Sequence, residues 1–455
     1  MTRKRAVLYA AMCTSFMTSF MSSALNLSVP ALESHFQVSA ATISWIVTTY
    51  TIAIAAMSLP FGKIADQTGR RRVFLTGIAG FGIFSVLCIF SGSIWTILVY
   101  RALQGGCAAM IFATNNAILI TCYPHEEQGK AIGYAVAATY VGLSAGPAVG
   151  GILNSTFGWR SIFLCSVVIS FASFWLALRA TSGIPDTSGK LQKSFDRTGS
   201  LIYFAAIITS LYGLTSLKSQ TAGPFCLAAG ILLLALFFLY EKRNADPIMK
   251  VSMFLESRTF TFSNLAALLN YGATFAISYT ISIYLQVVCG IESGRAGLIL
   301  VMMPLVQAVF SPAAGSLSDR IRPSVLASVG MGICVLTLLL FSRLSLTTPL
   351  WYVILSLCLT GFGFALFSSP NMNAILQCVS PSDYGVANSI IATMRTYGQS
   401  VGMAILTIVT SVILGAGTLE HSAPEELLRM MHVSFLIFAV LCVAGLFFSL
   451  ARNRE

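Results

Sequence analysis

The chain has 455 residues, of which 56% are hydrophobic and only 9% are charged. Soluble globular domains carry about 25% charged residues, so this composition excludes a water-soluble protein and predicts an all-α integral membrane protein. The net charge of +11 is spread over short segments between long apolar runs, so we expect no nucleic-acid partner.

Apolar runs long enough to cross a bilayer, which takes roughly 20 helical residues, occur fourteen times. They cover residues 6–29, 42–61, 73–93, 95–121, 131–153, 161–180, 200–217, 224–240, 259–287, 296–316, 324–342, 348–369, 384–415 and 430–451. Most of the 27 basic residues fall in the segments that lie on the same side as both termini. The positive-inside rule therefore predicts a plasma-membrane protein with both termini cytoplasmic.

The loop after the second span concentrates charge. GKIADQTGRRRV (62–73) holds Asp66, Arg70 and Arg72, with glycines that permit a tight turn. Asp66 can face a helix N-terminus or pair with a neighbouring arginine, and in this way it could join two helices while one side of the protein is closed. The arginines could equally serve only to anchor the topology.

Arg101 lies within the fourth span, in the run RALQGG, which also holds Gln104. A charge at the bilayer centre costs roughly 2.5–3.5 kcal/mol on insertion scales, so Arg101 should face a cavity, a partner or a set of backbone carbonyls. The fifth span contains GLSAGPAVGG, where Gly146 and Gly150 allow another helix to approach closely. Pro147 removes one backbone hydrogen bond and kinks the helix. Packing alone would also explain this glycine spacing.

The charged loop has a counterpart after the tenth span. GSLSDRIR at 315–322 shares the pattern Gly-x-x-x-Asp with residues 62–69, so Asp319 corresponds to Asp66 when the two motifs are aligned. Related halves of six helices are common in transporters, but here the repeat returns after eight spans. We therefore predict three units: a first six-helix bundle, linkers with two inserted helices, and a second six-helix bundle. Their bounds are 1–181, 182–258 and 259–455.

These motifs, in this order, resemble those of the major facilitator superfamily, specifically its fourteen-helix drug:proton antiporter family. The resemblance covers nearly the whole chain and includes a late run, YGVANSIIATMRTYGQSVGMAI, around Arg395. It implies transport by alternating access, gating by the charged loop, proton coupling through Arg101, and a fifth helix that seals against its partner in the other half. With the repeated loop included, the predicted gating and coupling residues are Asp66, Arg70, Arg72, Arg101, Gln104, Gly146, Pro147, Gly150 and Asp319.

The sequence departs from that family at one position. Members typically carry an aspartate in the first helix, five residues before an asparagine; here Asn26 matches the asparagine, but Met21 stands at the aspartate position. None of the 16 acidic residues lies inside a predicted span. Without a carboxylate to attract a cation and carry a proton, a dicationic antiseptic is not the expected substrate.

The expected cavity lining is neutral and aromatic, which suits an uncharged, planar or amphipathic solute held by stacking and a few hydrogen bonds. The predicted binding residues are Asn26, Tyr50, Asn116, Tyr140, Asn270, Tyr271, Gln307, Arg395 and Tyr397. Each polar side chain among them could equally join two helices, and Arg395 could extend to the cytoplasmic interface. Two arginines without buried acids would also tolerate an anion.

Three functions remain open on these observations. The loop and fifth-span motifs favour proton-coupled export of lipophilic drugs or antibiotics. The missing carboxylates favour a carrier for one neutral or anionic metabolite, including an importer of a vitamin-like nutrient. A membrane-bound enzyme is the third, although the sequence has no clustered metal ligands and no phosphate-binding loop. We expect no enzymatic activity, no cofactor and no metal, and a monomer whose partners are a small-molecule substrate, protons and the lipid bilayer.

Overall fold

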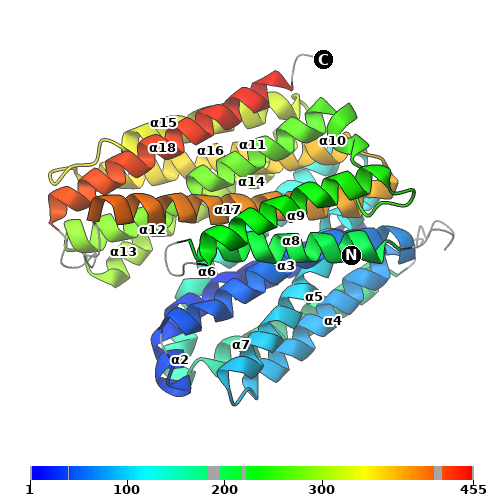
Figure 1. Cartoon of the computed structure of the whole chain (residues 1–455), viewed down its shortest axis with the longest axis horizontal. Coiled ribbons are helices and arrows are strands. Elements are labelled where there is room, and N and C mark those ends of the chain that lie inside the picture. Colours follow the sequence, from blue (N-terminus) through cyan, green and yellow to red (C-terminus); the bar gives the residue numbers. More distant parts are fainter. Residues whose placement is uncertain (1–2, 39, 183–194, 218–221, 415–422, 453–455) are drawn as a thin grey trace.

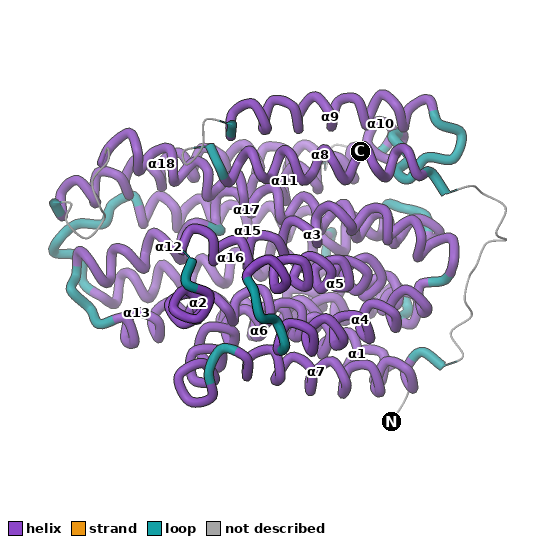
Figure 2. Tube along the Cα trace, turned by 60° about the horizontal axis from the view of Figure 1, so that its bottom comes forward, coloured by secondary structure: helices purple, strands orange, loops and turns teal. Residues whose placement is uncertain are grey.

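The computed structural model describes residues 3–38, 40–182, 195–217, 222–414 and 423–452. Within these ranges every regular element is helical and none is a strand (Figure 2). The long helices lie alongside one another in two groups, coloured blue to cyan and green to red in Figure 1. The buried apolar side chains form two clusters: one lies within the first group, and the other joins the second group to residues of the first, such as Leu59 and Ile132.

The first bundle consists of six long helices in chain order. They are α1 (Arg3–Ser23), α3 (Ala40–Thr68), α4 (Arg70–Ile89), α5 (Ile94–Cys122), α6 (Gln128–Phe157) and α7 (Arg160–Ala180). α5 packs against both α3 and α4, and α1 packs against α6 and α7. A 3-10 turn (Ala24–Ser28) and the short α2 (Val29–Phe36) lie between α1 and α3.

The second bundle also has six spanning segments, and a single residue, Phe275 or Val301, divides each of the first two into two labelled helices. They are α11 and α12 (Arg258–Thr274 and Ala276–Ile283) with a π turn at Tyr284–Val288, α13 and α14 (Ser293–Leu300 and Met302–Ser318), α15 (Pro323–Phe341), α16 (Leu350–Gln377), α17 (Tyr384–Leu414) and α18 (Pro424–Ala451). The sequence indicated both segments as continuous spans, and Arg258–Val288 and Gly294–Ser318 each count as one span. Helical hydrogen bonding continues at both dividing residues, from the Phe275 N–H to the Tyr271 carbonyl oxygen and from the Val301 N–H to the Gly297 carbonyl oxygen.

The two bundles meet along two helix pairs. α6 packs on α14, and α3 packs on α17. Glycines permit the closest approaches: a Cβ at Gly62 would lie 2.6 Å from the Gly385 carbonyl oxygen, and one at Gly129 would overlap the Gly315 carbonyl oxygen. A side chain at either position would push the bundles apart.

The two inserted helices form a hairpin over one of these pairs. α8 (Arg197–Thr215) packs against α9 (Gly223–Arg243) and also contacts α3 and α17 (Figure 1). The Tyr203 hydroxyl lies 3.2 Å from the Ala55 carbonyl oxygen of α3 and 2.8 Å from the Thr393 hydroxyl of α17. The hairpin therefore touches both bundles where they join.

Thirteen of the described helical segments are long and apolar enough to cross a membrane. α1 is the remaining span expected from the sequence, and it misses that criterion because serines and threonines occupy much of its second half. It still packs inside the first bundle, where Met17 and Phe20 are fully buried. The all-α fold of two six-helix bundles with two inserted helices is thus confirmed.

The charged segment 62–73 is not the loop that the sequence indicated. α3 continues through Asp66, and only Gly69 separates it from α4. Gly69 has a φ of 114°, a conformation that is readily available to glycine and strained for other residues. In the same way α14 continues to the residue before Asp319. Both aspartates therefore lie at the ends of long helices, which fixes their positions more firmly than a loop would.

Candidate functional site

Each bundle places one aspartate on the first backbone amides of a helix in the other bundle. Asp66 accepts hydrogen bonds from the Gly385 N–H and from the next N–H of α17, both at 3.1 Å. Asp319 accepts from the Gly129 N–H and from the next N–H of α6, at 2.7 and 3.0 Å. The first N–H groups of a helix lack intrahelical partners and carry partial positive charge. We call these contacts the Asp66 clasp and the Asp319 clasp.

Arg70 strengthens the Asp66 clasp. Its Nε donates to Asp66 Oδ1 at 2.8 Å, and a terminal nitrogen contacts the Pro381 carbonyl oxygen just before α17. The guanidinium also lies over the Tyr384 ring, at 5.4 Å from the ring centre. Arg72 is exposed. Arg70 therefore joins α4 to the same segment of the second bundle that Asp66 holds.

The Asp319 clasp lies at the same end of the molecule as the Asp66 clasp, together with the start of α1 and the end of α18 (Figure 1). We call this end the Asp66 end. Burial raises the pKa of Asp319 above its usual value, although the two N–H groups that it accepts from favour the charged form. A further contact here joins Lys250, after α9, to Asp383, before α17, at 2.8 Å. The two clasps hold the bundles together at the Asp66 end, and the Lys250–Asp383 pair joins the segment after α9 to the second bundle.

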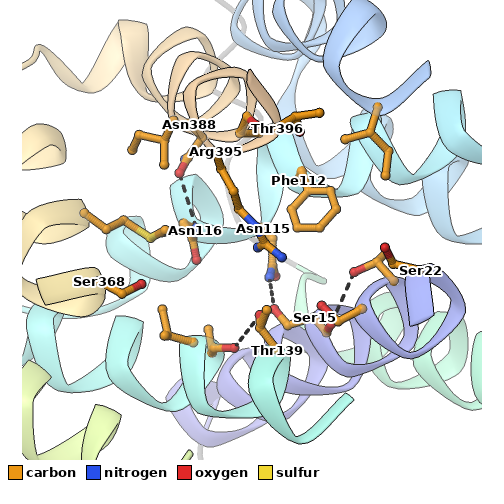
Figure 3. A pocket seen from close by; sticks show the side chains of 18 of the residues that line it. Ser15, Ser22, Phe112, Asn115, Asn116, Thr139, Ser368, Asn388, Arg395 and Thr396 are labelled. Carbon is orange, nitrogen blue, oxygen red and sulfur yellow. Dashed lines mark hydrogen bonds between the residues drawn. The ribbon is translucent and has the colours of Figure 1, made fainter. Parts of the chain in front are cut away.

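A cavity of about 90 Å³ lies between the bundles (Figure 3). α1, α3, α5 and α6 line it on one side, and α11, α16 and α17 line it on the other. Hydroxyl and amide side chains make up much of the first wall, including Ser15, Thr18, Ser19, Ser22, Asn115 and Asn116. None of the described lining residues is acidic, and Arg395 is the only basic one.

Four of the residues expected to bind substrate line this cavity: Asn116, Tyr140, Tyr271 and Arg395. The Tyr140 and Tyr271 rings each meet the ring of Phe364 at a steep angle, with centroids 5.8 and 5.3 Å away. Asn116 donates to an amide oxygen of α17 at 3.3 Å. The Arg395 guanidinium projects into the cavity from α17 (Figure 3). Both bundles therefore contribute to one aromatic and polar site.

Other residues expected to bind substrate lie away from the cavity. Asn270 is buried in α11, where its amide nitrogen contacts a cysteine of α18. Gln307 is buried in α14. The Tyr397 hydroxyl meets the Ser210 hydroxyl of α8, because it projects from α17 toward the inserted hairpin. The side chain of Asn26 lies outside the described residues.

Arg101 is fully buried in the first bundle. Its Nε donates to the Ile46 carbonyl oxygen of α3 at 3.0 Å, and a terminal nitrogen donates to Gln104 Oε1 at 2.6 Å. The other terminal nitrogen is 3.5 Å from the Met21 carbonyl oxygen of α1. The ring of Tyr50, which was also expected in the cavity, lies 4.2 Å from the guanidinium carbon. Among the described residues, the hydrogen-bond partners of Arg101 are thus uncharged, and it joins α5 to α1 and α3.

The glycines of GLSAGPAVGG face α1 and the turn that follows it. A Cβ at Gly142 would lie 2.5 Å from a carbonyl oxygen of α1, one at Gly150 would lie 2.6 Å from a carbonyl oxygen of the following turn, and Gly146 is equally close. In this conformation these glycines therefore contact the first bundle itself, and the seal against the other bundle stays a prediction. At about 100° per residue, Gly142 lies half a turn around α6 from Gly133, and it is Gly133 that faces α14. Pro147 lies within α6, between these contacts.

The hydroxyl-bearing wall of α1 was missed by sequence reasoning. Ser15, Thr18, Ser19 and Ser22 all line the cavity, and their spacing of three, one and three residues places them on one face of a helix. That spacing was a usable signal. Asn388 of α17 also lines the cavity, but a lone asparagine near a helix start gives no such pattern.

Known proteins are similar to this chain in sequence or in fold. The chain is 29% identical over 443 residues to the riboflavin transporter RibZ of Clostridioides difficile (strain 630), covering 97% of this chain and 95% of that protein. It is 27% identical over 431 residues to the multidrug resistance protein Stp of Mycobacterium tuberculosis (strain ATCC 25618 / H37Rv), covering 91% and 78%. The crystal structure of the human organic anion transporter MFSD10 matches with a TM-score of 0.70 at 14% identity, covering 99% of this chain and all of that one.

The family model described as Major Facilitator Superfamily matches residues 11–254 and 263–455, which together make up nearly the whole chain. Two bundles that meet at a shared cavity agree with that match. The chain belongs to the Major Facilitator Superfamily.

Proposed function

We propose that the protein is a secondary transporter that moves small uncharged or anionic organic molecules across the plasma membrane by alternating access. The observation that carries this proposal is the cavity between the bundles, whose described lining offers hydroxyls, amides, aromatic rings and Arg395 but no carboxylate. A cationic solute would leave water without gaining an opposite charge in this site. The similarity to the riboflavin transporter RibZ supports the proposal, because riboflavin has a planar ring system and carries no net charge.

The two clasps would act as gates. In the present conformation both are formed, at the end that the charge distribution predicts to be cytoplasmic. The cavity of about 90 Å³ is smaller than the roughly 300–1,000 Å³ of pockets for drug-sized ligands, so the bundles must move apart to admit a substrate. We propose residues 1–181 and 259–455 as the two moving units, with 182–258 between them.

Breaking the clasps is within reach of a transport cycle. Each clasp consists of two hydrogen bonds to a carboxylate, and hydrogen bonds to charged groups contribute about 1.5–3 kcal/mol each. A substrate whose binding free energy is more favourable for the open conformer, by as much as these hydrogen bonds contribute, would offset the loss of the clasps. Arg70, which binds both Asp66 and the segment before α17, would act with the Asp66 clasp.

Proton-coupled export of lipophilic drugs or antibiotics is the second candidate function. It is supported by the similarity to the multidrug resistance protein Stp and by Arg101, whose buried network with Gln104 occupies the position that the sequence resemblance assigns to coupling. The absence of a carboxylate among the described lining residues weighs against it, since no acid at the substrate could exchange a proton. Membership of a family of transporters favours both candidates over a membrane-bound enzyme.

Transport by the purified protein in liposomes tests the proposal. Liposomes would be offered three fluorescent or labelled solutes: riboflavin, an aromatic carboxylate and the cation ethidium, with and without an imposed pH gradient. We expect the uncharged or the anionic solute to cross and ethidium to stay outside. Transport of ethidium alone would refute the proposed cargo. Accumulation that follows the pH gradient, together with proton release on adding substrate, would favour the second candidate.

A further inference from the structure

Arg395 is the only charged side chain among the described residues that line the cavity. Within the described part of the chain Arg395 makes no hydrogen bond and no ion pair. Its guanidinium makes a cation–π contact with the Tyr271 ring, whose centre is 5.9 Å from the guanidinium carbon. A guanidinium carries five N–H donors in a planar arrangement and cannot give up its charge. The donors of Arg395 therefore face the cavity (Figure 3) with their hydrogen-bonding capacity unused by the protein.

Two further polar atoms in the cavity wall have no partner in the described structure. They are Ser19 Oγ of α1 and Asn388 Nδ2 of α17, in side chains that are 2% and 3% exposed. The amide oxygen of Asn388 accepts from Asn116 at 3.3 Å, so only its nitrogen, a donor, is unused. Since buried polar groups are normally hydrogen-bonded, these atoms indicate a ligand that accepts hydrogen bonds from both bundles.

Flat aromatic faces lie beside these donors. Phe112, Tyr140 and Tyr271 all line the cavity, and the Tyr271 ring lies next to the Arg395 guanidinium. A ligand that reaches Arg395 with an acceptor group can therefore place an aromatic ring against one of these side chains at the same time.

The surrounding charges leave the cavity positive. Arg101 is held by its own uncharged partners deeper in the first bundle. Asp66 and Asp319 are engaged at the Asp66 end and do not line the cavity. In a site of low dielectric, an uncompensated cation attracts an anion much more strongly than it would in water.

We propose that the cavity is a binding site for an aromatic carboxylate, with the carboxylate paired to the Arg395 guanidinium. Such pairs are often bidentate, with two parallel N–H···O bonds. Asn388 Nδ2 supplies a further donor from the same helix, and Ser19 supplies one from the opposite wall. This assignment rests on the proposed transport function and narrows its cargo from uncharged or anionic solutes to anionic ones.

The test compares matched acids and amides. The purified full-length protein in lipid nanodiscs would be titrated with naphthalene-2-carboxylate and naphthalene-2-carboxamide, and with the corresponding anthracene pair. We expect the wild-type protein to bind at least one acid tenfold or more tightly than its amide. Arg395→Gln should remove that preference and leave amide affinity within about twofold, whereas Arg395→Lys should keep part of it. These expectations follow from the charge-assisted pairing.

Arg343→Gln is the matched control, because it makes the same change at an exposed site and should leave the preference intact. Asn388→Asp keeps the oxygen that accepts from Asn116 but adds a negative charge to the cavity wall that also holds Arg395. It should lower acid affinity at least tenfold and spare the amide. Thermal unfolding of each variant shows whether it is folded.

Equal affinity for acid and amide, a preference that persists in Arg395→Gln, or failure of every probe to bind would each overturn the assignment. Uptake into liposomes distinguishes failure of the anion-site assignment from failure of the proposed transport function. If liposomes take up the amides as readily as the acids, the transport proposal stands and only the anion site is refuted. If no aromatic solute of any charge is taken up, the transport proposal itself fails.

Discussion

Arg101 and Arg395 are both interior arginines, but they differ in how many of their N–H donors have a hydrogen-bond acceptor in the protein. Arg101 donates to carbonyl and amide oxygens on neighbouring helices and lies over a tyrosine ring. Arg395 has a ring beside it and no hydrogen bond within the described residues. An arginine whose donors are all used by the protein stabilises structure, whereas one that faces a cavity with its donors unused is available to a ligand.

Replacing Arg101 by lysine should lower both thermal stability and transport. An ammonium group cannot reach Ile46, Met21 and Gln104 together and does not stack flat on Tyr50. Each buried acceptor left unpaired costs about 1–3 kcal/mol, so we expect a melting temperature lower by several degrees and transport reduced at least tenfold.

The measurements are thermal unfolding in detergent and solute uptake into liposomes. Arg343→Lys, at an exposed site, is the matched control and should behave as the wild type. A stable Arg101→Lys variant with normal uptake would show that the hydrogen bonds of Arg101 are dispensable.

Tyrosines show how far the site could be predicted from the sequence. Tyr50, Tyr140, Tyr271 and Tyr397 all lie in apolar spans and were given the same role. Only Tyr140 and Tyr271 line the cavity. The other two face Arg101 and the inserted hairpin. Composition identifies which residues can face a cavity, but which of them do depends on the rotation of each helix about its axis, and that is set by its packing partners.

At the scale of single helices, α6 carries two sets of glycines that face different neighbours. Gly129 and Gly133 bring it close to α14 of the other bundle, while Gly142, Gly146 and Gly150 bring it close to α1 and the turn after it. The first set lies at a contact that must separate if the bundles move, and the second lies within one bundle. The glycine-rich run around Pro147 therefore has a packing role that the sequence resemblance did not indicate.

Gly146→Ala should destabilise the first bundle. Its Cβ would overlap Ser23 Oγ and lie 3.0 Å from the Ala24 nitrogen, so α1 would have to shift. Overpacking of this kind costs about 1–3 kcal/mol. Gly332→Ala is the matched control: a Cβ there meets nothing within 4 Å, so a change of up to about 1 kcal/mol in the stabilising direction is expected from helix propensity.

Thermal unfolding in the same detergent compares the two variants. If both glycines tolerate alanine equally, the close approach of α6 to α1 is not needed for stability. Alanine at Gly146 that changes the unfolding temperature little but increases solute leak through liposomes would instead favour the sealing role first expected for this run.

The inserted hairpin was predictable as an element but not in its placement. The spacing of the two Gly-x-x-x-Asp motifs indicated two extra helices, because the repeat came late. Nothing in the sequence of α8 indicated that the Tyr203 hydroxyl would lie between Ala55 of α3 and Thr393 of α17. Contacts between distant segments depend on tertiary packing, for which local composition carries little information.

For the whole molecule, the two clasps give the Asp66 end an approximate twofold symmetry. Each bundle supplies one carboxylate and one helix start, so rotation of the bundles away from each other would break both clasps together. The overall fold was predictable because the lengths of the apolar runs indicate the number of spans, and the repeated motif indicates two related bundles. The pairing of α3 with α17 and of α6 with α14 was not predicted, because many packings satisfy the same set of spans.

Hydrogen exchange can test whether the clasps open together. Asp66→Ala removes the acceptor of the Gly385 N–H and of the next N–H of α17, so these amides should exchange faster. If the bundles separate as rigid bodies, the amides at the start of α6, held by Asp319, should also exchange faster. An effect confined to α17 would contradict concerted opening, and Glu425→Ala, at an exposed site, is the control.

The polar face of α1 has a consequence for how the protein is made. Inserting α1 into the bilayer is less favourable than inserting the other helices, which are apolar enough to span a membrane on their own. The reason is that the hydroxyl groups of α1 are more stable against protein than against hydrocarbon. Stable insertion of α1 then depends on α6, which is synthesised later and whose glycines allow α1 to pack closely against it. We expect chains shortened before α6 to insert α1 poorly, measured by glycosylation-site mapping; efficient insertion of α1 alone would show that it needs no such partner.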